Sequence, residues 1–183
     1  MSVTPVTSVT LPSWAQVSNK RRAHIERVVA LLDRWAAALQ LPDDEASRWR
    51  AAGTLHDALR DAPEPMLRVL TGEGTLPAEL LHGPAAATRA EQDGERRGDV
   101  LEAVRYHTIG FPNWERTGRA LYLADFLEPG RKFLVSERAA LADRVPVDFD
   151  DAFREGVRLR IEWSLKQRGK LFPETVALWN AVR

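Results

Sequence analysis

The four histidines of this chain occur one at a time, at intervals that match one helix plus its connection to the next. With Asp125 included, the intervals run from 18 to 32 residues. Helices at this spacing can each direct one side chain into a shared interior. The pattern therefore favours a fold in which several helices converge on one place. Its members, in order, are His24, His56 with Asp57, His82, His107 and Asp125.

From Ser18 onward, apolar residues recur with the period of a helix, and no stretch shows the sustained alternation of a strand. Gly53 lies inside one expected helix, where glycine costs about 1 kcal/mol relative to alanine; a close helix crossing near the site would explain it. We predict an all-α fold of about seven to nine helices. The expected helices cover residues 20–40, 45–59, 65–70, 77–92 with a break at Gly83-Pro84, 99–108, 114–127, 136–143, 149–167 and a last segment after Pro173.

The composition excludes several classes of protein. Lys+Arg and Asp+Glu balance at 26 each, so no net charge attracts nucleic acid or an anionic membrane. The absence of cysteine excludes disulfides, thiolate metal sites and cysteine nucleophiles. No apolar run approaches the roughly 18 residues of a membrane span, and the first residues do not resemble a signal peptide. We therefore expect a cytoplasmic protein that binds neither nucleic acid nor membrane.

The chain divides into a short tail and one domain. Residues 1–17 are rich in Ser, Thr, Val and Pro and show no helical period, so we expect a flexible or loosely docked tail with Trp14 as its anchor. Residues 18–183 suffice for one well-buried core and are too few for two, so a single domain is expected.

The spaced histidines and aspartates are candidate metal ligands. His24, His56 and His107 lie on apolar stripes of their expected helices. Burying such groups, and carboxylates above all, costs several kcal/mol unless they are paired or bind a metal. Asp57 follows His56 directly, and both can reach one site where a helix ends; its two oxygens can then bridge two cations. His24 and Asp125 would complete one metal site, and His82 and His107 the other.

Such a site has a definite chemistry. Imidazole with carboxylate suits Fe, Mn, Co, Ni or Zn better than calcium. Six protein groups leave open positions on two metals, as in catalytic sites. Two metals about 3.5–4 Å apart can activate water and stabilise phosphoryl transfer. No GxSxG or GxxxxGK[ST] motif points to another mechanism.

Four local sequences resemble the HD-domain superfamily of metal-dependent phosphohydrolases, and within it the YqeK family of bacterial symmetrical diadenosine tetraphosphate hydrolases. The resemblance covers about residues 20–180. It is carried by AAGTLHDALRDA (51–62), ELLHGPAAA (79–87), AVRYHTIGFPNW (103–114) and LYLADFLEPGR (121–131).

The resemblance implies an HD-type helical bundle with a dinuclear metal centre, in which a metal-bridging hydroxide cleaves diadenosine tetraphosphate into two ADP. Iron is the expected metal, with Mn, Co, Ni, Zn or Mg as alternatives. The implied ligands are His24, His56, Asp57, His82, His107 and Asp125.

The chain departs from the family pattern at four positions, and these bear on substrate choice rather than on metal binding. Arg60 stands where the family usually has lysine, Ala86 where it has glycine, Phe111 where a basic residue is common, and Phe172 where a histidine often precedes the proline.

Further residues near the ligands have two interpretations each. Asp57, Arg60 and Asp61 are the catalytic candidates, although Asp61 could instead cap the following turn. Arg60, Thr108, Gly110 and Arg131 are the candidates for substrate contact; the two arginines could equally be surface residues, and Thr108 and Gly110 could simply end a helix.

The aromatic residues near the ligands also have two interpretations. Phe111 and Trp114 could stack on a base or belong to the core. The core is expected to hold Trp35, Trp49, Trp163 and Trp179.

Two other functions remain open. One is a related HD-type hydrolase of another nucleotide, such as a nucleotidase or diphosphohydrolase. The other is a non-catalytic HD module that binds nucleotide or protein, which is disfavoured because all six ligands are kept. The arginine-rich face of residues 154–170 could also serve a homodimer.

Overall fold

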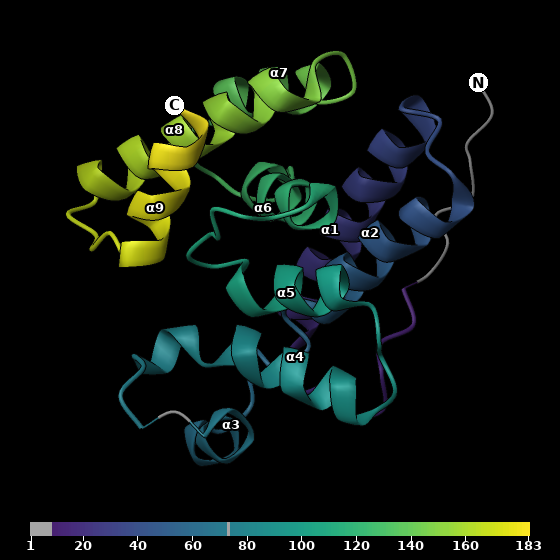
Figure 1. Ribbon diagram of the computed structural model, residues 1–183, viewed down its shortest axis with the longest axis vertical. Helices are drawn as coiled ribbons and strands as arrows, with labels where there is room; N and C mark the ends of the chain where they lie inside the picture. The colour runs from purple at the N-terminus through teal and green to yellow at the C-terminus, as the bar shows by residue number, and fades with distance from the viewer. Residues whose placement is uncertain (1–8, 73) are drawn as a thin grey trace.

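The computed structural model describes residues 9–72 and 74–183, and these residues form helices and loops with no strand. The all-α prediction is therefore confirmed for the described part of the chain (Figure 1). The helices are α1 (Asn19–Ala38), α2 (Asp43–Leu55), α3 (Glu64–Thr71), the 3-10 helix η1 (Ala78–Leu80), α4 (His82–Gln92), α5 (Gly98–Tyr106), α6 (Arg116–Leu127), α7 (Val135–Arg144), α8 (Phe149–Lys166) and α9 (Pro173–Val182). None of the helices in residues 9–72 and 74–183 is both long and apolar enough to cross a membrane.

Helix α1 shows how the local sequence sets helix limits. The Ser18 hydroxyl accepts a hydrogen bond from the backbone N–H of Arg21 and caps the start of the helix. At the other end, Gln40 adopts a left-handed backbone with φ of 51°, and Pro42 cannot continue the helix. One side of α1 faces the interior, and this side includes His24.

Helix α6 is the centre of the fold. It contacts α1, α2, α5, α7 and α8, and Figure 1 shows it surrounded by these helices. Every residue from Ala120 to Leu127 is buried, including Asp125. A helix that is buried on all sides lies in the core of the fold, so a carboxylate on it requires polar partners nearby.

Helices α1 and α2 cross closely at Gly53. A Cβ atom at this position would lie 2.7 Å from Leu32 Cδ1 and 3.1 Å from Val29 Cγ2. The predicted close crossing is therefore confirmed. It brings the C-terminal end of α2, which carries His56, against the helix that carries His24.

The expected break at Gly83-Pro84 is wrong. Helix α4 instead begins at His82 and runs through both residues. Proline is tolerated here because it falls in the first turn, where the backbone N–H groups have no partner within the helix. Gly83 has a packing role, since a Cβ there would lie 2.9 Å from the carbonyl oxygen of Val104 in α5.

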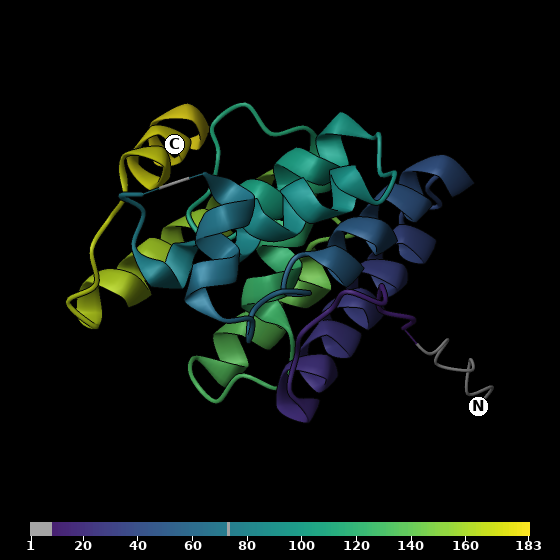
Figure 2. The ribbon, with the colours of Figure 1, turned by 90° about the horizontal axis from the view of Figure 1, so that it is seen from below.

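Part of the expected tail lies against the domain. Residues 1–8 are outside the described residues, whereas Val9 is buried and packs with Ile25 and Val29 of α1. Figure 2 shows the chain that follows residue 8 running beside α1. The predicted anchor Trp14 donates from Nε1 to Asp93 Oδ2 (3.0 Å). The segment from residue 9 to residue 17 therefore has defined contacts with the domain.

Candidate metal centre

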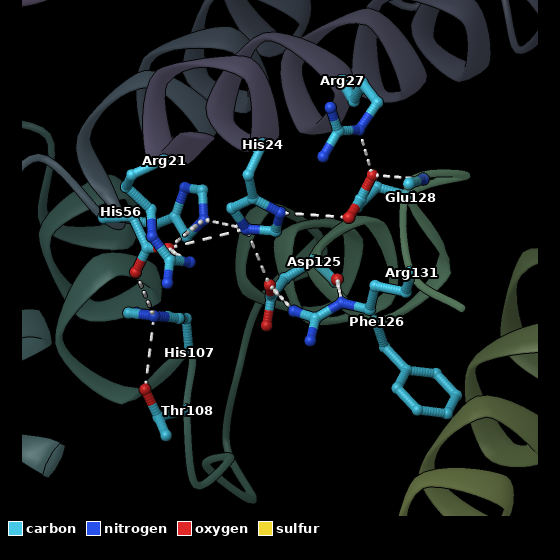
Figure 3. A network of polar contacts seen from close by, with 12 residues as sticks. Arg21, His24, Arg27, His56, His107, Thr108, Asp125, Phe126, Glu128 and Arg131 are labelled. Carbon is cyan, nitrogen blue, oxygen red and sulfur yellow. Dashed lines mark hydrogen bonds and ion pairs between the residues drawn. The ribbon is translucent and has the colours of Figure 1, made fainter. Parts of the chain in front are cut away.

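The six predicted ligands come together in the interior, at one place where α1, α2, α4, α5 and α6 meet. All six are buried, with exposed fractions of 6% or less. Ligand atoms fall into two groups, each lying within 4.8 Å of one another: His24 with His56 and Asp57, and Asp57 with His82 and His107. Figure 3 shows His24, His56 and His107 pointing toward the common interior.

Asp57 is shared by both groups. Its Oδ2 lies 3.5 Å from His24 Nε2 and 3.6 Å from His56 Nε2. Its Oδ1 lies 3.2 Å from His82 Nε2 and 3.5 Å from His107 Nε2. Each oxygen of one carboxylate thus faces a different pair of histidines. Asp125 joins the first group, with Oδ1 at 3.2 Å from His24 Nε2.

The backbone sets the ring orientation of three histidines in the same way. The Nδ1 atoms of His56, His82 and His107 lie 2.7, 3.0 and 2.8 Å from the carbonyl oxygen three residues earlier in the chain. A carbonyl can only accept, so Nδ1 carries the proton and donates. The neutral ring then presents the lone pair of Nε2 to the centre, which is the form that binds a metal.

His24 has a different orienting partner. Its Nδ1 lies 3.2 Å from Oε1 of Glu128, a side chain that is 2% exposed. Glu128 also accepts hydrogen bonds from Arg27 Nε and from the backbone N–H of Gly130, as Figure 3 shows. Glu128 was not among the predicted site residues, because the Glu-Pro-Gly stretch indicated only the end of a helix. Its position three residues after Asp125, one turn further on, was the available signal.

The pKa values favour ionised carboxylates and, for two histidines, neutral rings. Burial lowers the pKa of His56 to about 4 and also lowers the pKa of His82. Burial alone would raise the pKa of Asp57, but the neighbouring histidines, His56 first, hold it well below its ordinary value. Burial likewise opposes ionisation of Asp125, and Arg131 and His24 outweigh it. These are the protonation states that metal ligands require.

The surroundings of His24 favour the charged, doubly protonated ring when no metal is bound. Burial tends to lower its pKa, but hydrogen bonds with Asp125 and Glu128 outweigh burial and raise the pKa to about 9. One proton thus partly offsets the negative charge of the buried carboxylates. A metal at this position would take the place of that proton.

The spacing of the nitrogen atoms fits two cations. His82 Nε2 and His107 Nε2 lie 3.2 Å apart, and His24 Nε2 and His56 Nε2 lie 3.3 Å apart. Two lone pairs at this distance repel each other unless a cation or a proton lies between them. Ligands about 2.0–2.2 Å from one metal stand about 3.0–3.5 Å apart, close to the separations found here. The six residues therefore fit two divalent cations that share Asp57.

Three arginines surround the two aspartates. Arg21 Nη1 donates to Asp57 Oδ2 (2.6 Å), and Arg131 Nε donates to the carbonyl oxygen of Asp125 (2.8 Å). Arg131 also donates to the Asp125 carboxylate, and Figure 3 shows its guanidinium folded against that residue. Arg160 Nη1 lies 3.5 Å from Asp125 Oδ2. The sequence analysis included Arg131 and missed the other two. Arg21 lies three residues before His24 on the same helix, which was a usable signal; Arg160 lies 35 residues after Asp125 and offered none.

The catalytic candidates next to Asp57 differ in their surroundings. Arg60 is half-buried, and its charge contributes to the lowered pKa of His82, after the larger effects of burial and His107. Asp61 is exposed, and its Oδ2 accepts a hydrogen bond from the backbone N–H of Ser18 (2.7 Å). Its contact is thus with the residue that caps the start of α1, and not with the turn that follows Asp61.

The candidates for substrate contact also differ in their surroundings. Thr108 Oγ1 lies 3.2 Å from His107 Nε2 and 3.4 Å from His82 Nε2, so it borders the centre. Gly110 has φ of 91°, and a Cβ there would lie 2.6 Å from Leu178 Cδ2 of α9. Glycine at this position is therefore explained by packing and by the backbone.

The two aromatic candidates pack within the protein. Phe111 stacks on Tyr106, with ring centroids 4.7 Å apart. Trp114 is 3% exposed and packs against Tyr122. The core interpretation therefore accounts for both residues.

Comparison with known proteins supports the assignment of the metal centre to an HD domain. A family profile described as "HD domain" matches residues 21–145. Three bacterial relatives bear the name symmetrical bis(5'-nucleosyl)-tetraphosphatase. The relative from Bacillus subtilis is 27% identical over 74% of this chain and 76% of its own length. Those from Halalkalibacterium halodurans and Staphylococcus aureus are 33% and 32% identical, and the matches span 56% and 63% of this chain but only 54% and 62% of the relatives.

A solved structure agrees with the fold. A crystal structure from Clostridium acetobutylicum, described as a predicted HD superfamily hydrolase involved in NAD metabolism, superposes with a TM-score of 0.76 at 27% identity. The match covers 91% of this chain and 90% of the other. Because the HD domain profile spans more than half of the sequence and includes His24, His56, Asp57, His82, His107 and Asp125, this chain belongs to the HD domain family.

Proposed function

We propose that this protein hydrolyses diadenosine tetraphosphate symmetrically, so that water cleaves the central phosphoanhydride and two ADP are released. The observation that carries the proposal is the position of Asp57, whose two oxygens each face a separate pair of histidine nitrogens. The names of the three relatives support the choice of substrate.

The centre would hold two divalent cations in two adjacent sets of ligands. His24, His56, Asp57 and Asp125 form one set, and Asp57, His82 and His107 form the other. When bound, divalent cations lower the pKa of water and offset negative charge on phosphate oxygens. We propose iron as the metal. Metal analysis of protein purified without added metal, under anaerobic conditions, tests this choice, and manganese, cobalt, nickel, zinc or magnesium in its place would contradict it.

The chain's own residues would orient the substrate. Arg131 and Arg160 lie beside Asp125, and Arg21 lies beside Asp57, so cationic groups flank the position of a polyphosphate. A guanidinium has five N–H groups and can hold a carboxylate and a phosphate at the same time. Arg60 stays a proposed phosphate contact. The Thr108 hydroxyl, next to His107 and His82, is placed to donate to a phosphate oxygen.

Product analysis tests the proposed reaction. Metal-loaded protein is incubated with diadenosine tetraphosphate, and the products are separated by ion-exchange chromatography. ADP as the sole product supports symmetrical cleavage, whereas ATP with AMP would contradict it. Faster turnover of a mononucleotide would favour the nucleotidase alternative. Absence of bound metal and of any phosphohydrolase activity after iron or manganese loading would favour the binding module.

A further inference from the structure

A cavity of about 350 Å³ borders the metal centre between α6, α8 and the segment that leads into α9. Three of its lining residues also contact the centre. Thr108 lies beside His82 and His107, while Arg131 and Arg160 lie beside Asp125. Cavities that hold small molecules have volumes of about 300–1,000 Å³. This cavity is therefore large enough for a ligand that also reaches the metal centre.

The wall next to the metal centre is cationic. Arg160 Nη2 donates to the carbonyl oxygen of Thr108 (3.1 Å), and its guanidinium lies over the Tyr122 ring at 4.3 Å. These contacts hold Arg160 between α8, α6 and the turn after His107. Arg131 is held in the same way by Asp125. Two ordered guanidinium groups thus stand between the cavity and the metal centre, as the recognition of a phosphate group requires.

Another wall of the cavity is aromatic. The rings of Phe133 and Trp163 are stacked, with centroids 4.5 Å apart and planes at 9°, and both residues are half-buried. Phe126 adjoins them, and in Figure 3 its side chain points away from the histidines toward the C-terminal helices. From its apolar helical pattern, Trp163 was expected to lie in the core. The structure places it at the edge of a cavity, where a ring can receive a planar partner.

We propose that this cavity binds one nucleoside of the substrate, with the base against the Phe133–Trp163 pair and the adjoining phosphates beside Arg131 and Arg160. The inference rests on the proposed function, because it assigns the cavity to the substrate of that same centre. A base has a flat apolar face and stacks on aromatic side chains, whereas its phosphates need positive charge. From the metal ligands outward, the cavity offers first the positive charge of the arginines and then the aromatic surface.

Two other cavities fit a nucleoside less well. One of about 450 Å³ lies between α1 and α7, and its lining residues include Arg27 and Arg34 but none of the metal ligands, Thr108 or Arg131. Another of about 230 Å³ also borders Thr108, but it is smaller, and its lining holds both Arg105 and Glu174 and so has no excess of positive charge. Continuity with the metal centre and positive charge therefore favour the cavity at Trp163.

Calorimetric titration of the metal-loaded protein with ADP and with inorganic pyrophosphate tests the proposal. Trp163→Ala should weaken ADP binding about 5- to 150-fold, the range for loss of one base stack, and should leave pyrophosphate binding unchanged. Trp163→Phe keeps a ring and should bind ADP nearly as well as the wild type. Val69→Ala is the control, because this apolar side chain on α3 is 84% exposed and does not line the cavity, so it should change neither affinity. If Trp163→Ala fails to fold, Phe133→Ala provides the same comparison.

The outcomes separate this inference from the proposed reaction. Unchanged ADP binding in Trp163→Ala, or equal weakening of ADP and pyrophosphate, would overturn the nucleoside cavity even if the wild type cleaves diadenosine tetraphosphate. Conversely, selective loss of ADP binding would support the cavity even if chromatography showed no ADP from that substrate. In the active enzyme, the KM of Trp163→Ala should rise by a similar factor while kcat changes far less.

Discussion

Replacing Glu128 with glutamine should affect one half of the metal centre and not the other. The Glu128 carboxylate receives three donors: Arg27 Nε–H and the backbone N–H of Gly130 at Oε2, and His24 Nδ1–H at Oε1. Glutamine has the same size but offers one oxygen and one NH₂ group. Two donors meet at the Oε2 position, so the amide oxygen should stay there and the NH₂ group should face His24.

The consequence is a change in the tautomer of His24. A metal binds only the neutral ring, and in that form Nδ1 must accept a hydrogen bond from the NH₂ group, so the remaining proton lies on Nε2. This is the atom that lies 3.2 Å from Asp125 Oδ1 and 3.3 Å from His56 Nε2. A proton there removes the lone pair that would bind a metal. Loss of an orienting partner typically weakens metal affinity 10- to 100-fold, about 1.4–2.7 kcal/mol.

Titration of metal-free protein with Mn²⁺, followed by calorimetry, measures this effect. The wild type should show two binding events, and Glu128→Gln should weaken only one of them, because His82 and His107 are oriented by backbone carbonyls. Glu95→Gln, at a half-buried carboxylate that pairs with Arg97, is a matched control that should retain both events. Equal weakening of the two events, or no weakening at all, would refute the assignment of Glu128 to His24.

Further predictions concern the shared carboxylate, one glycine and the ion pair between Arg97 and Glu95. Asp57→Ala should lose correct placement of both metals and nearly all turnover; a metal count and activity assay that match the wild type would refute the site. Gly110→Ala should lower stability by about 1–3 kcal/mol, because of its positive φ and the contact with Leu178, with KM unchanged in the folded protein; a raised KM at equal melting temperature would instead indicate substrate contact. The hydrogen bonds of Arg97 lower the pKa of Glu95 from 4.5 to about 2, so this carboxylate stabilises the fold above pH 4.5 and its contribution disappears as the pH falls toward 2. In urea unfolding, Glu95→Gln should therefore be less stable than the wild type at pH 7 and should approach it at pH 2–3; an equal difference at both pH values would contradict the shift.

The helices and the ligand set could be predicted because both have local signals. Apolar periodicity located each helix to within a few residues, as for α8, expected at 149–167 and found at Phe149–Lys166. His24, His56 and His107 marked the site because each lies on an apolar stripe, where a polar ring needs partners. The break expected at Gly83-Pro84 failed because the same two residues are equally suited to the first turn of a helix.

The surroundings of the ligands could not be predicted in the same way. Arg160 reaches Asp125 only because α8 packs on α6, a contact between residues far apart in the sequence. Trp163 shares the apolar pattern of core residues, and only the packing of α8 shows that it borders a cavity. Periodicity indicates which face of a helix is covered. It does not indicate whether the covering is another helix or a space for a ligand.

The N-terminal segment has a consequence for how the protein is expressed. Gln16 exchanges backbone hydrogen bonds with the turn that follows Asp57: its N–H donates to Ala58 (2.8 Å), and its carbonyl accepts from Asp61 (3.2 Å). The Asp61 side chain holds Ser18 in turn. These hydrogen bonds hold the N-terminal segment against the turn that carries Asp57, the carboxylate shared by both metal positions. A fragment that begins at residue 18 would contain every metal ligand and still lack this support. We expect such a fragment to have weak activity, and the cause would be the boundary chosen and not the chemistry of the enzyme.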